Sequence, residues 1–131
     1  MEFYKIPKGI CLIKWNNEIG AILVSKYPKN LKITTKQLTN IYASHRMSNL
    51  NPNFAILTLT DTKVISFFSG IGENVIIEPD HIVALILRRD EKPIKFKALL
   101  KEAATKILSN LKDEKYENLF PNLYKEMVKI S

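Results

Sequence analysis

Few of the residue types that perform catalysis or bind metals occur in this sequence of 131 residues, which contains one cysteine and two histidines. Cys11 lies within the apolar run 10–13, which indicates a thiol of the core rather than a nucleophile. His45 and His81 are not part of an HxxxH pair, and no carboxylates cluster beside them. The sequence therefore predicts no zinc site, no thiolate cluster and no disulfide within the chain.

Two short segments resemble parts of active sites. Asp80 and His81 are residues of the types that form acid–base pairs, but neighbours in a strand point to opposite faces, so we expect them not to pair. Ser69-Gly70-Ile71-Gly72 resembles a phosphate-binding loop. It leads into an apolar run and lacks the Lys-Ser/Thr of such loops, which favours a turn between strands. We expect a protein that is not an enzyme, holds no cofactor and acts by binding other macromolecules.

The remaining candidates for function are basic and aromatic residues. Residues 26–36 contain four lysines and no acidic residue, so this segment either attracts an acidic or phosphate-bearing partner or is ordinary solvated surface. Its single aromatic residue, Tyr27, falls short of the stacking platform that binds single-stranded nucleic acid. Aromatic residues outside the segment are candidates for interface anchors, although core packing is favoured for Tyr42. The partner-binding candidates are Lys26, Lys29, Lys32, Lys36, Trp15, Tyr42 and Arg46.

The elements that must position these residues begin with a hairpin. Apolar runs predict strands from about Gly9 to Trp15 and from about Ala21 to Tyr27, joined by a polar turn. Thr34 and Gln37 then have the spacing of a capping box, which predicts the start of a helix that ends near Ser48.

Three strands and two helices complete the predicted order. The strands run from about Phe54 to Thr60, from Val64 to Ser69 and from Val75 to Leu87. Proline cannot donate a hydrogen bond to a ladder, so the last strand should bend at Pro79 and be regular from His81 onward. Apolar residues then recur at helical spacing from Phe96 to Leu111, and a last helix starts near Pro121.

The apolar pattern indicates how these elements pack. Residues 10–13 and 82–87 are apolar at consecutive positions, so both faces of these two strands must be buried. The order ββαβββαα therefore predicts one domain, residues 1–131, of the α/β (α+β) class. We expect a five-stranded antiparallel sheet with one helix on one face and two C-terminal helices on the other. Strands with more polar residues, such as Thr58 and Thr60, should lie toward the edges.

The composition is that of a folded chain in a reducing compartment. Hydrophobic residues make up 46% and charged residues 25%, which is the ordinary globular range. The net charge of +7 is concentrated in residues 1–50, which carry eight basic and two acidic side chains. The first residues lack a signal peptide's apolar stretch, and no apolar run approaches the roughly 20 residues that span a bilayer. Together with the single cysteine, these features predict a cytoplasmic protein.

The hairpin, helix, three-stranded meander and two C-terminal helices resemble the longin domain, part of the longin/roadblock group of profilin-like folds, over nearly the whole chain. Roadblock relatives begin with a helix, which residues 3–15 do not predict. The resemblance implies the strand order 2-1-5-4-3, with the two fully apolar strands at the centre. It also implies a non-enzymatic module of vesicle-trafficking or small-GTPase regulatory complexes. Because no SNARE helix or membrane anchor follows the last predicted helix, we expect an adaptor or GTPase-associated subunit.

The resemblance further implies pairing through the third strand and the first helix, residues 36–47. The candidates for this dimer edge are Phe54, Ile56, Thr58 and Thr60. The first hypothesis is therefore a homodimer or adaptor subunit that binds a protein partner, such as a small GTPase or another longin or roadblock subunit, with possible peripheral contact to an anionic membrane. The alternative is a basic nucleic-acid-associated protein, whose binding would fall steeply with salt.

Overall fold

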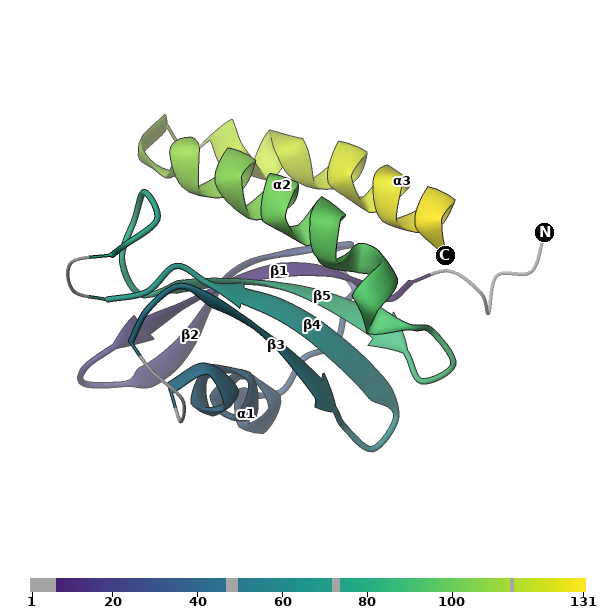
Figure 1. The fold of residues 1–131 in the computed structure, drawn as a ribbon, viewed down its shortest axis with the longest axis horizontal. Coiled ribbons are helices and arrows are strands. Elements are labelled where there is room, and N and C mark those ends of the chain that lie inside the picture. The colour runs from purple at the N-terminus through teal and green to yellow at the C-terminus, as the bar shows by residue number, and fades with distance from the viewer. Residues whose placement is uncertain (1–6, 47–49, 72–73, 114) are drawn as a thin grey trace.

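The computed structural model describes residues 7–46, 50–71, 74–113 and 115–131, and it places a five-stranded antiparallel sheet between two layers of helices (Figure 1). The strands are β1 (Gly9–Asn16), β2 (Gly20–Tyr27), β3 (Asn53–Thr58), β4 (Thr62–Phe68) and β5 (His81–Arg88). The helices are α1 (Thr35–Arg46), α2 (Lys97–Ser109) and α3 (Phe120–Ile130), with short 3-10 helices η2 (Pro93–Phe96), η3 (Leu111–Asp113) and η4 (Lys115–Leu119).

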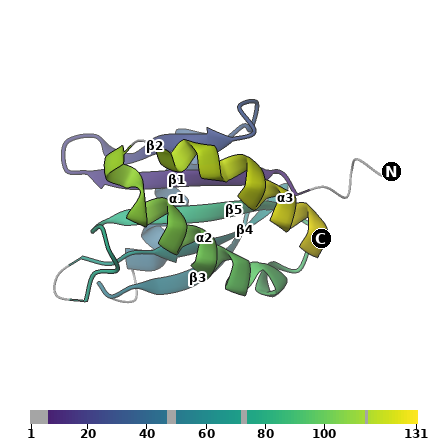
Figure 2. The same ribbon diagram turned by 90° about the horizontal axis from the view of Figure 1, so that it is seen from above.

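The strand order is β2-β1-β5-β4-β3, and every neighbouring pair is antiparallel, as Figure 2 shows from above the helices. This is the order that the resemblance implied. The central strands are β1 and β5, in which residues 10–13 are fully buried and residues 82–87 are at most 4% exposed. Because water reaches neither face of these strands, the sheet needs helices on both sides.

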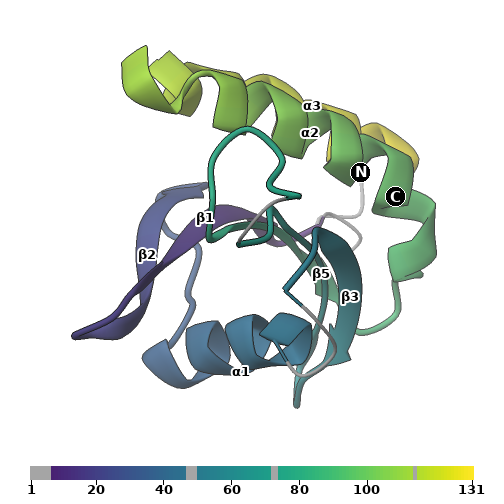
Figure 3. The same cartoon turned by 60° about the vertical axis from the view of Figure 1, so that its left-hand side comes forward.

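Each face of the sheet has its own hydrophobic core. The core under α2 and α3 contains Leu12, Leu85 and Phe96, whereas the core under α1 contains Ile13, Ile41 and Phe68. Figure 3 shows α1 on one side of the sheet and α2 with α3 on the other. The predicted layers are therefore confirmed, with one helix on one face and two on the other.

The capping box at the start of α1 forms as predicted. The Gln37 amide N–H donates to Thr34 Oγ1 at 3.1 Å, and the Thr34 amide N–H donates to Gln37 Oε1 at 2.8 Å. These two bonds satisfy backbone donors that the first turn of a helix leaves without partners. The structure describes α1 as far as Arg46, so the predicted end near Ser48 lies outside the described residues.

A buried histidine fastens α1 to the sheet. His45 is fully buried, and its Nδ1 lies 2.8 Å from Asn53 Oδ1 on β3 while its Nε2 lies 2.7 Å from Ser66 Oγ on β4. Since the amide oxygen can only accept, Nδ1 carries the proton and Nε2 accepts from the serine. Burial lowers the pKa of His45, although the bond to Asn53 opposes this. The ring is therefore neutral and structural.

The structure corrects the predicted third strand of the meander. Residues 75–80 form a loop, and only the half from His81 is strand. Positive φ angles of 65° at Ile77 and 60° at Asp80 are incompatible with a regular ladder. The amides of Ile76 and Asp80 instead donate to the carbonyls of Ser69 and Gly70, at 3.0 and 2.8 Å. The expected turn at Ser69 is thus the start of a longer connection between β4 and β5, and its Gly72 lies outside the described residues.

The edge strand is also shorter than predicted. β3 ends at Thr58. The turn to β4 begins at Leu59, whose backbone N–H donates to the Thr62 carbonyl at 2.8 Å. Thr60 therefore lies in the β3–β4 turn, outside the strand that the sequence predicted for it. The Thr60 carbonyl accepts a hydrogen bond from the Arg89 guanidinium at 2.8 Å instead.

Candidate interaction site

Cys11, Asp80 and His81, the residues with catalytic potential, have separate surroundings in the structure. Cys11 is fully buried, and burial raises the pKa of its thiol to about 12. Asp80 and His81 do not pair, because Asp80 contacts Tyr42 and the His81 ring lies 2.8 Å from the Pro79 carbonyl. Within the described part of the chain, no three His, Cys, Asp or Glu residues are placed to hold a metal, and no helix is long and apolar enough to cross a membrane.

Three of the predicted binding residues gather at one end of the sheet, together with Asp80. We call Trp15, Tyr42, Arg46 and Asp80 the aromatic–arginine cluster. The Trp15 and Tyr42 rings stack with centroids 4.5 Å apart and an interplanar angle of 13°, and the Arg46 guanidinium lies 5.5 Å from the centre of the Tyr42 ring. The Tyr42 hydroxyl donates to Asp80 Oδ1 at 2.7 Å and accepts a hydrogen bond from Arg46.

The polar groups of this cluster satisfy one another. Burial and the bond to Asp80 raise the pKa of Tyr42 to about 12, against the opposing effect of Arg46, so the hydroxyl stays protonated and donates. The cluster ties the β1–β2 hairpin, α1 and the loop before β5 together, and the Trp15 amide adds a bond to the Asp80 carbonyl at 3.3 Å. Such stacking contributes about 0.5–1.5 kcal/mol beyond simple burial. The arrangement therefore indicates a structural role for Trp15, Tyr42 and Asp80, whereas Arg46 is exposed.

The lysines of segment 26–36 differ in their surroundings. The Lys26 ammonium donates to the Leu31 carbonyl at 2.8 Å and so folds the segment onto itself. Lys29, Lys32 and Lys36 are exposed. Tyr27, the one aromatic residue of the segment, packs edge-on against Tyr124 at 5.6 Å, which leaves it poorly placed to stack on a base.

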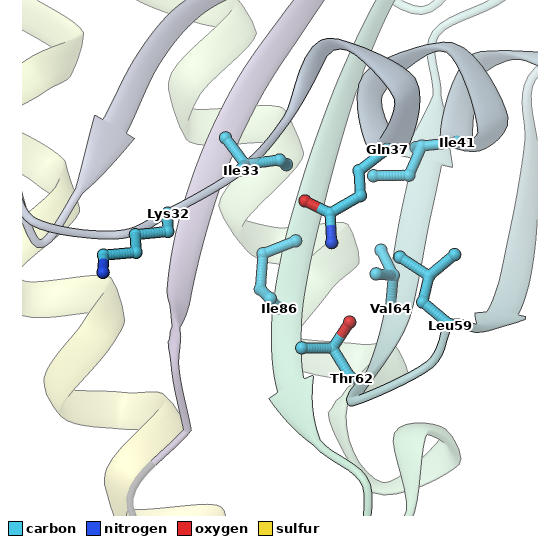
Figure 4. Close-up of a pocket in the computed structure, with 8 residues that line it drawn as sticks. All are labelled: Lys32, Ile33, Gln37, Ile41, Leu59, Thr62, Val64 and Ile86. Atoms are coloured by element: carbon cyan, nitrogen blue, oxygen red, sulfur yellow. The ribbon is translucent and has the colours of Figure 1, made fainter.

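A small pocket lies between this segment and the sheet, as Figure 4 shows. The amide nitrogen of Gln37 and the hydroxyl of Thr62 point toward one another across it. Its volume of about 10 Å³ is that of a single water molecule, too small for an organic ligand. Thr62 is only 5% exposed, and its hydroxyl has no hydrogen-bond partner among the described residues.

The open edge of the sheet at β3 is the second predicted region. One flank of β3 pairs with β4, and the other has no neighbouring strand among the described residues. From Asn53 to Thr60 the chain carries no charged side chain. Ile56 is 52% exposed, although it is a large apolar residue in the middle of the strand. A six-residue uncharged edge offers free backbone donors and acceptors to another strand.

Successive side chains of β3 point to opposite faces of the sheet, so each lies either on the side of α1 or on the side of α2 and α3. Phe54 packs against the core under α2 and α3, and Ile56 pairs with Ile65 of that same core. Thr58 follows the same alternation. Phe54, Ile56 and Thr58 therefore lie on the face opposite α1, so the structure does not bring them together with Tyr42 or with the rest of the aromatic–arginine cluster.

A groove that sequence reasoning missed runs beside these residues. It has a volume of about 540 Å³ and is lined by Phe54, Ile94, Lys95, Lys97, Ala98 and Lys101. Ile94 is 62% exposed, and the Lys97 ammonium lies 5.0 Å above the centre of the Phe54 ring. One signal for it existed, because Ile94 is a lone isoleucine between Pro93 and Lys95 in an otherwise mostly charged stretch, residues 88–95. We call β3 together with this groove the β3–α2 edge.

Comparison with known proteins adds no functional assignment to this geometry. No protein-family model matches the chain. No curated protein is significantly similar to it in sequence.

Proposed function

We propose that this chain is a non-enzymatic protein-interaction module that binds its partner through the β3–α2 edge. The observation that carries the proposal is the uncharged, unpaired strand β3 with the half-exposed Ile56 at its centre. Proteins usually protect such an edge with charges, prolines or bulges, because it pairs readily with other strands. An edge without these features is well suited to strand addition by a partner.

The proposal extends to the class of complex. The strand order and the placement of the helices support a longin-like domain that acts as a dimer or adaptor subunit in a cytoplasmic vesicle-trafficking or small-GTPase regulatory complex. The partner in this view is a small GTPase or another longin or roadblock subunit. The exposed Lys29, Lys32 and Lys36 would add peripheral attraction to an anionic membrane.

The nucleic-acid alternative has weaker support. It depends on the same three exposed lysines, whereas Lys26 is bound to the Leu31 carbonyl and Tyr27 packs against Tyr124. Charge without stacking groups gives nonspecific binding that declines steeply with salt. We therefore propose protein interaction as the function.

Site-specific photo-crosslinking in cells tests the proposal. A photoreactive phenylalanine replaces Ile56 in the full chain, and the matched control carries it in place of Ile19, which is 75% exposed in the turn between β1 and β2. We expect discrete adducts from position 56 and none of the same mass from position 19. An adduct of twice the chain's mass identifies a homodimer, and mass spectrometry identifies any other partner.

The proposal is contradicted if position 56 gives no adduct of its own while the protein is folded and expressed. Adducts that form equally from both positions contradict it as well, because they reflect random collision rather than a defined edge.

A further inference from the structure

The β3–α2 edge presents exposed isoleucine side chains and the Phe54 ring beside the unpaired backbone of an edge strand. Ile56 and Ile94 are 52% and 62% exposed, and Phe54, which shares a face of β3 with Ile56, lines the groove together with Ile94. These residues come from segments about 40 positions apart in the chain, so their proximity is a feature of the fold. Apolar side chains beside unpaired strand donors and acceptors are what an added strand requires.

The charged side chains that line the groove are all basic. Three of its six lining residues are lysines and none is acidic. Within the described part of the chain, no carboxylate lies within salt-bridge distance of the ammonium groups of Lys95, Lys97 or Lys101. This differs from the outer face of α2, where Lys106 is paired with Glu102 at 2.8 Å. The groove therefore presents three ammonium groups without an ion-pair partner among the described residues, of which Lys95 lies near enough to Glu91 to oppose the burial that raises the pKa of that carboxyl.

We propose that the β3–α2 edge binds an extended acidic segment of another protein, which adds to the sheet as a sixth strand beside β3. Its apolar side chains contact Phe54, Ile56 and Ile94, and its carboxylates lie within reach of Lys97 and Lys101. The backbone hydrogen bonds supply affinity without regard to sequence, while the lysines select acidic segments over basic ones. This inference rests on the proposed function and names the chemistry of the partner.

The same charges argue against a second copy of this chain as the occupant. Antiparallel pairing of two β3 strands about a two-fold axis places both α2 helices on the same face of the joined sheet. Two sets of the lysines Lys95, Lys97 and Lys101 would then approach one another. Like charges brought together at an interface are destabilising. An acidic segment removes this repulsion and replaces it with attraction.

The test uses two labelled ten-residue peptides that carry threonine at every second position. The positions between them share one face of a strand, and they alternate valine with glutamate in one peptide and valine with lysine in the other. Fluorescence anisotropy measures their binding to the full chain and to Lys97→Glu/Lys101→Glu. The matched control, Lys112→Glu/Lys125→Glu, makes the same change in net charge at two exposed lysines away from the groove. Circular dichroism checks that each variant is folded.

We expect the glutamate peptide to bind the wild-type chain and the control with affinities within about twofold of each other. Reversal of two exposed charges should weaken its binding to Lys97→Glu/Lys101→Glu by about tenfold. The same variant should gain affinity for the lysine peptide, a result that loss of folding cannot produce. Ile56→Lys should weaken the binding of the glutamate peptide as well.

The outcomes that overturn the inference are distinct from those that overturn the proposed function. Equal binding of both peptides to the wild type, or no effect of Lys97→Glu/Lys101→Glu, refutes the acidic segment. So does the absence of any peptide binding by the wild type. In each case adducts specific to position 56 would leave the proposed function standing, and their absence would remove both.

Discussion

The aromatic–arginine cluster and the β3–α2 edge contain the same kinds of residue, but one is closed and the other is open. In the cluster, the Tyr42 hydroxyl is bonded to both Asp80 and Arg46, and its ring is covered by Trp15. At the edge, Ile56 faces solvent and the lysines beside it have no carboxylate within salt-bridge distance among the described residues. Residue type alone therefore does not identify a candidate binding surface. Groups that the fold leaves without partners are the better guide.

The largest loss of stability should come from truncating Tyr42 in the aromatic–arginine cluster. Tyr42→Ala removes a side chain that is 5% exposed and contacts both Trp15 and Phe68, so we expect a loss of about 3 kcal/mol in the free energy of unfolding. Tyr42→Phe removes only the hydroxyl and should cost about 1 kcal/mol. Urea denaturation measures both. A Tyr42→Phe chain of unchanged stability that no longer binds the glutamate peptide would reverse the roles of the two regions.

Acid should next weaken the attachment of α1 to the sheet through His45. His45 has a lowered pKa when folded, so the unfolded chain binds more protons as the pH drops below its usual value of about 6.5. This contribution to stability is complete above that pH and is lost as the pH falls toward the lowered pKa. Thermal melts from pH 7.5 to 5 should therefore show a steeper loss for the wild type than for His45→Gln. A flat wild-type profile would contradict the account.

Thr62 differs from the other buried polar residues under α1, such as His45 and Ser66, whose polar groups are hydrogen-bonded. Its buried hydroxyl has no hydrogen-bond partner among the described residues, so Thr62→Val should raise the free energy of unfolding by about 1 kcal/mol. Ser66→Ala, on the same strand, removes a hydroxyl that is bonded to His45 and should have the opposite sign. Equal losses from the two substitutions would mean that the Thr62 hydroxyl is satisfied.

The smallest change in stability is expected for a substitution at the β3–α2 edge. Ile56→Lys changes a half-exposed residue of an edge strand, so we expect the free energy of unfolding to stay within about 0.5 kcal/mol of the wild type. Ile19→Lys, in the exposed turn between β1 and β2, is the matched control for stability. A loss of more than about 2 kcal/mol from Ile56→Lys would mean that the residue supports the fold.

The layers of the fold could be predicted because burial leaves a pattern in the sequence. Residues 10–13 and 82–87 are apolar at every position, which requires central strands, and Thr34 with Gln37 marks the start of α1. The loop 75–80 could not be predicted in this way. Its apolar run 75–77 looks like a strand, and the positive φ angles that break the ladder depend on hydrogen bonds to Ser69 and Gly70.

The candidate site was predicted only in part. Edge placement of β3 followed from its polar residues, but the face on which Phe54 and Ile56 lie depends on the register with β4. The groove depends on η2, a turn that brings Ile94 and Lys95 beside β3 and that has no helical period of its own. Asp80 was considered only as a partner of His81. Its contact with Tyr42, 38 positions away, follows from the conformation of the loop.

Amide hydrogen exchange tests the central claim most directly, because it reports on the open and closed regions in one experiment. The full chain is measured by mass spectrometry with and without a saturating amount of the valine–glutamate peptide. The account predicts that segment 53–58 exchanges faster than β5 in the free chain and becomes protected when the peptide binds, with residues 42–46 and 74–81 unchanged. Protection confined to residues 42–46 and 74–81, with segment 53–58 unaffected, would contradict it.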